Sequence, residues 1–454
     1  MVFALSERFK MIKLGQKLNV AVMGEIMMTR PVSVFEEPTF LSVIELFRNA
    51  DVAVTNIEGL FGGYSGYSVS TGTPMSGEAW IAEEYKWAGF NLVSIANNHT
   101  MDYGVEGLLA TIEALNKARL AYAGAGRDLW EARQPAYLET KKGRAGMVAS
   151  TSAGLYLGTH THAAATESGN GLRGRPGVNP LRYDVVYTVT PSQFEEMKKI
   201  VEQWRLRPSW QLPIRPSIEK DELNFLGSRI VSGDTPGFRY IPLKADVEGN
   251  LRSIRNAKRN AALVVASHHT HERDPTLASE WGYASAAYIR KYAKDCIDAG
   301  ADVFYGHGDH NGQGMEIYKG RPIFYSLANP IVTSQNIKRL SLEEYEKYGL
   351  SSDNTIADWM AARRKVWGGY AEDRWVKAVV ASFTMQEGIL TELKLHPIDA
   401  SAGELPGTFV HRGVRPLMVE GEEARKIIER YAKLSETFGT EIEFKDGIGV
   451  VNIP

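Results

Sequence analysis

The feature that most constrains the fold is a series of six short apolar runs, each followed by residues with helical spacing. The runs are apolar on both faces, as is typical of strands buried between helix layers. Between two of them, Val105 to Leu115 places its apolar residues on one helical face. This alternation predicts an α/β fold with helices on both sides of a sheet. The predicted strands are Leu18–Gly24, Val52–Asn56, Leu92–Ala96, Ala145–Ser150, Ala262–Ser267 and Val303–Gly306.

Two stretches interrupt the alternation. The first is too long for a connecting loop, so we expect an insertion that forms a lid over the site. The second is charged and helical in pattern. After it, the chain is expected to form a β-hairpin that turns at Glu387-Gly388, an amphipathic helix and a final strand, Gly447–Ile453. The expected divisions are an N-terminal segment (1–17), the core (18–153 and 261–333), the lid (154–260), the charged insertion (334–370) and the C-terminal part of the core (371–454).

Composition excludes several classes of protein. The 52 lysines and arginines nearly cancel the 54 aspartates and glutamates, so the surplus of positive charge that would bind nucleic acid is absent. The single cysteine, Cys296, excludes a disulfide within the chain and a Cys-rich zinc module. The sequence shows neither a run of about 18 apolar residues nor the apolar core of a signal peptide. We therefore expect a soluble cytoplasmic protein without a membrane anchor, and a homo-oligomer remains possible.

The histidines are concentrated in a few places. Eight of the ten lie in four short groups, three of which directly follow a predicted strand. Acidic and amide side chains follow the first two strands, at Glu25 and at Asn56 and Glu58. The histidine groups are NNHTMD (Asn97–Asp102), SHHTHE (Ser267–Glu272), GHGDH (Gly306–His310) and THTH (Thr159–His162).

These polar groups predict a metal centre. Loops that leave the carboxyl ends of parallel strands converge on one crevice, so five strands would deliver their polar residues to one place. Imidazole, carboxylate and amide oxygen together suit Zn²⁺, Mn²⁺ or Fe²⁺, and the set is large enough for two divalent ions. Whether His268 or His269 points inward is open. The candidate ligands are Glu25, Asn56, Glu58, Asn98, His99, His268, His269, His307 and His310.

Other residues are candidates for catalysis or substrate binding. Asp102 either caps the following helix or orients His99. Arginine can clamp a carboxylate or a phosphate with two hydrogen bonds. The signatures of a P-loop, HExxH and GxSxG are missing. The catalytic candidates are His269, His310 and Asp102, and the substrate-binding candidates are Arg30, His160, His162 and Arg175.

The motifs also resemble a known family. GEIMMTR, DVAVTNIEG, ANNHTMDYG, SHHTHE and GHGDHNGQGMEIYKGRPIFYSLAN are similar, in this order, to the CapA/PgsA family of poly-γ-glutamate capsule biosynthesis. The resemblance covers Leu18 to Pro330 without the insertion. It implies a calcineurin-like metallophosphoesterase fold, a four-layer α/β/β/α sandwich. The strand pattern alone does not distinguish this from a single doubly wound sheet.

The resemblance also implies roles for individual residues. Glu25 stands where the family usually has Asp, and Glu58 takes the middle acidic position. Asn98 and His99 match the Asn-His pair of the fold. His269, or in the other register His268, matches the histidine of the fourth strand, although Thr270 stands where Trp is common. His307 and His310 match the final pair, with Gly308 where many members have another histidine.

Three functions follow as alternatives. The favoured one is a hydrolase in which a metal-bound hydroxide attacks an amide, γ-glutamyl or another carboxylate-bearing amide, in a small-molecule or peptide-like substrate. It is favoured because the family is associated with an amide polymer and this sequence lacks the anchor of the capsule proteins. The second is a phosphoesterase, although Met27 stands where that fold has the histidine of its Asp-x-His motif. The third is a non-catalytic capsule assembly protein.

Overall fold

The computed structural model describes most of the chain in two units, one containing Met1–Pro180 with Gly249–Pro454 and one containing Leu181–Glu248. The described residues are 17–62, 66–69, 72–155, 163–164, 174–203, 217–219, 221–225, 228–279, 282–333, 337–338, 340–367, 373–401 and 415–454.

The first unit contains a nine-stranded sheet in which the strands toward one edge are parallel. Strands β1 (Lys17–Val22), β3 (Val52–Asn56), β4 (Leu92–Ser94) and β5 (Ala121–Ala123) pair in parallel in this order. On the other side of β1, the sheet continues with antiparallel pairs, beginning with β22 from far along the chain and including two hairpins. Those strands are β22 (Lys377–Gln386), β23 (Ile389–Asp399), β24 (Leu417–Met418), β26 (Ile448–Val451) and β25 (Ile442–Lys445).

A second, six-stranded sheet lies against the first. Its strands β8 (Gly143–Thr151), β15 (Leu263–His269), β18 (Val303–His307) and β20 (Arg321–Phe324) are parallel. The antiparallel strands β7 (Ala136–Thr140) and β19 (Met315–Tyr318) form its two edges. The six predicted strands are therefore divided equally between two sheets.

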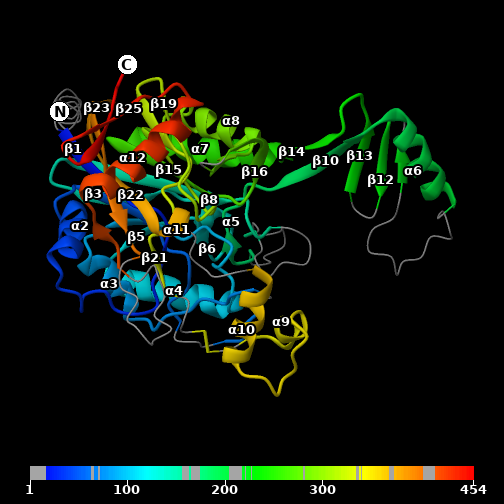
Figure 1. Cartoon of the computed structure of the whole chain (residues 1–454), viewed down its shortest axis with the longest axis horizontal. Coiled ribbons are helices and arrows are strands. Elements are labelled where there is room, and N and C mark those ends of the chain that lie inside the picture. Colours follow the sequence, from blue (N-terminus) through cyan, green and yellow to red (C-terminus); the bar gives the residue numbers. More distant parts are fainter. Residues whose placement is uncertain are drawn as a thin grey trace, which may run out of the picture. The chain divides into compact units, whose positions relative to one another are not determined.

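Alternate side chains of a strand pack on opposite faces of its sheet, and this alternation accounts for the layers of the fold. In β1, Val20 and Val22 join the core between the sheets, where Val265 of β15 also packs. Ala21 points to the other face, against the helices. Those helices are α2 (Pro38–Arg48), α3 (Ile81–Trp87) and α4 (Gly104–Ala118), which Figure 1 shows along one side of the first sheet.

The outer face of the second sheet is covered by α8 (Ala287–Asp298), where Tyr292 meets Phe304 of β18 edge to face at 6.3 Å. Helix α12 (Gly421–Glu436) contributes Ile428 and Tyr431 to the core between the sheets. The predicted α/β/β/α sandwich is confirmed, including its C-terminal hairpin and helix. The turn of that hairpin is at Glu387 and Gly388, which both have positive φ, as a two-residue hairpin turn requires.

The second unit has its own small sheet and core. Helix α6 (Pro191–Gln203) covers the sheet, and Phe194 packs on Leu223 and Ile230. The strands, in spatial order, are β11 (Ser217–Glu219), β12 (Glu222–Phe225), β13 (Ser228–Ser232), β10 (Tyr183–Val189) and β14 (Gly237–Pro242). This unit lies within the predicted insertion, and its role as a lid stays a prediction.

The remaining elements are short or peripheral. The charged insertion contains two helices, and the predicted single final strand is half of a hairpin, because β25 precedes β26. Within the described ranges, no helix has both the length and the apolar character to span a bilayer. The remaining elements are β2 (Ile26–Met27), β6 (Ala125–Gly126), α5 (Leu129–Arg133), β9 (Gly177–Val178), α7 (Lys244–Asn260), β16 (Arg273–Ser279), β17 (Gly282–Ser285), β21 (Ile331–Val332), α9 (Leu342–Glu346), α10 (Ile356–Trp367) and α11 (Asp373–Val376).

Candidate metal centre

The carboxyl ends of the parallel strands bring the predicted polar residues of both sheets together. From the first sheet, Glu25 follows β1 and Glu58 follows β3. From the second, His269 ends β15 and His307 ends β18. His310 Nδ1 lies 2.5 Å from Glu25 Oε1, although the two residues are 285 positions apart. The centre therefore lies where the two sheets meet.

Close backbone approaches hold the ligand loops in place. A Cβ at Gly24 would lie 2.0 Å from the carbonyl oxygen of Ala328, which accepts the amide hydrogen of Glu25 at 3.1 Å. A Cβ at Gly308 would lie 2.4 Å from the carbonyl oxygen of Thr270, and Gly308 has a φ of 109°. Only glycine fits such positions. Gly308, the second glycine of GHGDH, therefore allows the backbone of the loop after β18 to pack directly on that of the loop after β15.

Six side chains form two groups of possible metal ligands. Within each group, the three donor atoms lie within 4.8 Å of one another. The groups adjoin, because His269 Nδ1 lies 2.9 Å from His307 Nδ1 and His269 Nε2 lies 3.6 Å from Glu58 Oε1. The first group is Glu25, His269 and His307, and the second is Glu58, His271 and His310.

The carboxylates are suited to bind cations. Glu25 and Glu58 are fully buried, and among the described residues Glu25 Oε2 and both carboxylate oxygens of Glu58 have no hydrogen-bond partner. A buried carboxylate without a partner is costly, so such atoms are expected where a cation binds. Two carboxylates and four imidazoles make a donor set that Zn²⁺, Mn²⁺ and Fe²⁺ prefer. The residues present therefore fit two divalent ions.

The charges of the cluster are tightly coupled. Burial acts to raise the pKa of Glu25, but the His310 and His307 imidazoles outweigh it and hold that pKa below its ordinary value. Burial and the neighbouring Glu25 carboxylate raise the pKa of Glu58 well above its usual range. Burial lowers the pKa of His307 to about 3 and that of His269 well below its ordinary value. Both imidazoles are therefore neutral near pH 7, the form that binds metals.

His99 and Asp102 form a pair beside the two groups. Asp102 Oδ2 lies 2.7 Å from His99 Nδ1 and also accepts the amide hydrogen of Met75 at 2.7 Å. His99 Nε2 lies 3.9 Å from Glu58 Oε1, and His99 belongs to neither ligand group. Helix α4 begins at Gly104 with Tyr103 as its N-cap, so Asp102 is not the cap. Of its two expected structural roles, the contact with His99 fits that of orienting this ring, and a part for Asp102 in catalysis stays a prediction.

The two predicted amide ligands, Asn98 and Asn56, have different hydrogen-bond partners. Asn98 Oδ1 lies 2.8 Å from His269 Nε2, at the edge of the cluster. Asn56 Oδ1 instead accepts a hydrogen bond from Asn97 Nδ2 at 3.3 Å. This bond ties the Asn56 side chain to the loop after β4, and its role as a ligand stays a prediction.

The alternative between His268 and His269 is decided by the pleat of β15. Successive side chains of a strand point to opposite faces, and His268 points away from the cluster. Its Nδ1 lies 2.9 Å from Ser150 Oγ, and its ring meets Tyr292 at 5.4 Å. His268 is thus corrected from a candidate ligand to a buried residue under α8, where burial lowers its pKa to about 4.

Two of the four predicted substrate-binding residues, Arg30 and Arg175, lie in the described part of the chain. Arg30 is exposed after β2. The Arg175 guanidinium donates to the carbonyl oxygen of Ala163 at 3.2 and 2.9 Å, and these are its hydrogen bonds within the described part of the chain. The role of Arg175 in substrate binding stays a prediction. His160 and His162 lie outside the described residues.

Comparison with known proteins decides the family. Residues 19–334 match the family model of the bacterial capsule synthesis protein PGA_cap. The chain belongs to this family. The chain is also 30% identical to the uncharacterized protein y4sH of Sinorhizobium fredii (strain NBRC 101917 / NGR234), over 96% of this chain and 93% of that protein. It is 25% identical to the capsule biosynthesis protein CapA of Bacillus anthracis, over 75% of this chain and 66% of CapA. The predicted family resemblance is confirmed.

Solved structures give weaker likenesses. A phosphatase of Mycoplasma pneumoniae is 10% identical with a TM-score of 0.37, over 85% of this chain and 95% of that one. A putative 5'-nucleotidase of Staphylococcus aureus, in complex with alpha-ketoglutarate, is 13% identical with a TM-score of 0.32, over 68% of this chain and 48% of that one.

Sequence reasoning missed three residues at the centre of this PGA_cap chain. His271 is a member of the second ligand group, and its position two residues after His269 is the signal that could have found it. Trp375 of α11 packs against the His310 ring at 5.1 Å. The amide of Asn329, in its better orientation, donates to the carbonyl oxygen of Glu25 at 2.9 Å. The contacts of Trp375 and Asn329 join segments that are far apart in the sequence, so no local sequence pattern predicts them.

Proposed function

We propose that the chain is a metal-dependent hydrolase that cleaves an amide in a carboxylate-bearing substrate, most simply a γ-glutamyl amide. The observation that carries this proposal is the pair of adjoining ligand groups, with buried carboxylate oxygens of Glu25 and Glu58 that lack partners. Divalent ions held there would lower the pKa of a water and polarise the scissile carbonyl group.

The protein supplies a proton donor beside the ions. The Asp102 carboxylate accepts the hydrogen of His99 Nδ1 and so orients the His99 ring. The Nε2 atom of His99 then faces the cluster and donates its proton to the departing amine, because an amine leaves only when it is protonated. Both residues come from the loop after β4, which the second ligand group adjoins through Glu58.

The burial pattern supports a direction of approach for the proposed substrate. Glu25, Glu58 and His269 are fully buried. The His310 side chain is 23% exposed, that of His99 is 11% exposed, and His271 is exposed. The substrate therefore approaches past His99, His271 and His310, where the second ligand group and the proton donor meet.

The names of the relatives favour an amide over a phosphoester. They include the PGA biosynthesis protein CapA of Bacillus subtilis and a probable polyglutamine synthesis accessory protein of Mycobacterium tuberculosis. Poly-γ-glutamate is joined by amide bonds, so an enzyme of its metabolism meets amides that bear carboxylates. A phosphoesterase would use the same donor set, and the experiment has to separate the two.

The test compares two chromogenic substrates. Protein stripped with a chelator and reloaded with Mn²⁺ or Zn²⁺ is assayed with γ-glutamyl-p-nitroanilide and with p-nitrophenyl phosphate, next to Glu58→Gln. We expect turnover of the anilide that is lost with the metal, returns on reloading and is absent in Glu58→Gln. Turnover of the phosphate alone would favour a phosphoesterase, and no turnover with both ions bound would favour an assembly role.

A further inference from the structure

Arg273 is placed beside the second ligand group by two segments at once. It begins β16, two residues after His271. Its carboxylate partner, Asp309, directly precedes His310. Both flanking histidines belong to the second ligand group.

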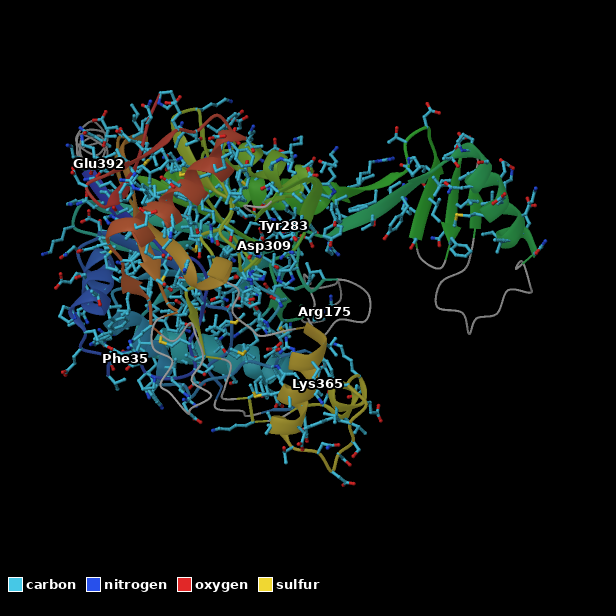
Figure 2. The ribbon with its side chains drawn as sticks, in the orientation of Figure 1. Phe35, Arg175, Tyr283, Asp309, Lys365 and Glu392 are labelled. Carbon is cyan, nitrogen blue, oxygen red and sulfur yellow. The ribbon has the colours of Figure 1, made fainter. Side chains whose placement is uncertain are left out.

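The guanidinium of Arg273 is held on several sides. Its Nε donates to Asp309 Oδ1, its Nη2 lies 3.4 Å from the carbonyl oxygen of Asp309, and its Cζ lies 4.7 Å above the ring of Tyr283. The Asp309 side chain is 3% exposed and its Oδ2 accepts from Gln313 Nε2 at 2.9 Å. Figure 2 labels Asp309 and Tyr283 next to each other. The arginine is therefore fixed by a buried network.

One edge of this guanidinium remains available. Among the described residues, Nη1 of Arg273 has no hydrogen-bond partner, and the side chain is 43% exposed. Arg290, which pairs with Asp274 of the same hairpin, differs: its Nη1 donates to Asp274 at 3.0 Å and to the carbonyl oxygen of Ser285 at 2.6 Å. An arginine that is already immobilised loses little conformational entropy when it binds an oxyanion.

The charge of the centre favours an anionic ligand. Two divalent ions would bring more positive charge than the carboxylates of Glu25 and Glu58 can neutralise. The Arg273 guanidinium lies between the loops that carry His271 and His310, and its Nη1 edge faces away from Asp309 and is open to a ligand. Arg273 thus extends the positive field of the centre toward its open side.

We propose that Arg273 is the carboxylate-binding subsite of this centre and holds the free carboxylate of the substrate through Nη1 and Nη2. The inference rests on the proposed function for the identity of the ligand, a carboxylate next to the scissile amide. It assigns to Arg273 the role that the sequence suggested for Arg30 and Arg175. Guanidinium and carboxylate match in a two-bonded arrangement, which a lysine at this position cannot reproduce.

The test measures binding without turnover. Glutarate, which has the carbon skeleton of a γ-glutamyl group, is titrated by calorimetry into metal-loaded wild type, Arg273→Gln, Arg273→Lys and the control Arg290→Gln. Glutaramide replaces glutarate in a second series. Gln keeps a donor for the buried Asp309, and metal content and thermal unfolding are measured for each variant. Because a hydrogen bond between charged groups contributes about 1.5–3 kcal/mol, we expect Arg273→Gln to weaken glutarate binding about 10- to 100-fold.

The remaining arms make the result specific. Arg273→Lys should recover part of the affinity, Arg290→Gln should bind as the wild type does, and glutaramide should bind equally weakly to all four proteins. Equal glutarate affinity in wild type and Arg273→Gln, at equal metal content, would overturn the subsite. Loss of binding in Arg273→Gln together with an absence of amide turnover would support the subsite and contradict only the proposed function.

Discussion

His310 Nδ1 lies 2.5 Å from Glu25 Oε1, and this contact joins the last ligand loop of the second sheet to the first ligand loop of the first sheet. Neither sheet alone provides a complete ligand group, because each group combines one glutamate of the first sheet with two histidines of the second. The candidate ligand groups therefore exist only in the assembled sandwich, and an ion bound there would be linked to the stability of the contact between the sheets.

The second ligand group can be tested through His271, because this exposed side chain carries little of the core. His271→Asn should reduce the number of bound ions from two to one and leave the thermal unfolding of the metal-free protein unchanged. Elemental analysis after dialysis measures the stoichiometry. His396→Gln serves as control, since His396 lies in β23 and bonds Ser382. Two ions in His271→Asn would show that the second group is wrongly assigned.

The pair of His99 and Asp102 should affect the rate rather than the metal. His99→Asn removes the proton donor, so we expect kcat to fall about 10²- to 10⁴-fold with both ions retained. Asp102→Asn removes only the group that orients His99, and a loss of about 10- to 100-fold is expected. The two effects should not add, because both act on one proton transfer. A loss of metal in His99→Asn would instead mark His99 as a ligand.

Ion binding should release protons. Burial and the Glu25 carboxylate raise the pKa of Glu58, so the metal-free protein keeps a proton on Glu58 at a pH where an ordinary glutamate is ionised. An ion must displace this proton, so affinity should fall as the pH is lowered through the range in which Glu58 becomes protonated. Calorimetry in buffers of different ionisation enthalpy counts the protons. Glu58→Gln should release fewer, and a pH-independent affinity of the wild type would refute this account.

Tyr305 should position the ligand loops. Its hydroxyl donates to the carbonyl oxygen of Met23 at 2.9 Å and accepts the amide hydrogen of Asn56 at 3.1 Å, two residues before each glutamate. Tyr305→Phe should destabilise the fold by about 1–3 kcal/mol and also weaken ion binding. Tyr325→Phe, which loses a buried bond to Glu316, is the control and should affect stability alone. Equal ion affinity in Tyr305→Phe and Tyr325→Phe would show that Tyr305 supports the fold and does not position the ligand loops.

The strands were the most predictable part of the structure. Val52–Asn56 has the bounds expected from its apolar run. The division of the strands between two sheets was not accessible from the runs themselves, because it depends on pairings such as that of β1 with β22, far along the chain. Only the family resemblance supplied it.

The site was partly predictable for a related physical reason. Glu25, Glu58, His269, His307 and His310 follow strand ends, where the fold itself gathers polar side chains. His268 was included as a candidate ligand because adjacent histidines were treated as equivalent. In the pleated strand β15, His268 and His269 point to opposite faces of the sheet. The network of Arg273 arises from contacts between loops, which the sequence pattern does not encode.

The most direct test of the central claim is a crystal structure of the metal-loaded protein with anomalous scattering at the absorption edge of the ion. We expect two peaks per chain, one among Glu25, His269 and His307 and one among Glu58, His271 and His310. A map without a peak between these side chains, from protein shown by elemental analysis to carry metal, would contradict the metal centre and with it the proposed hydrolase.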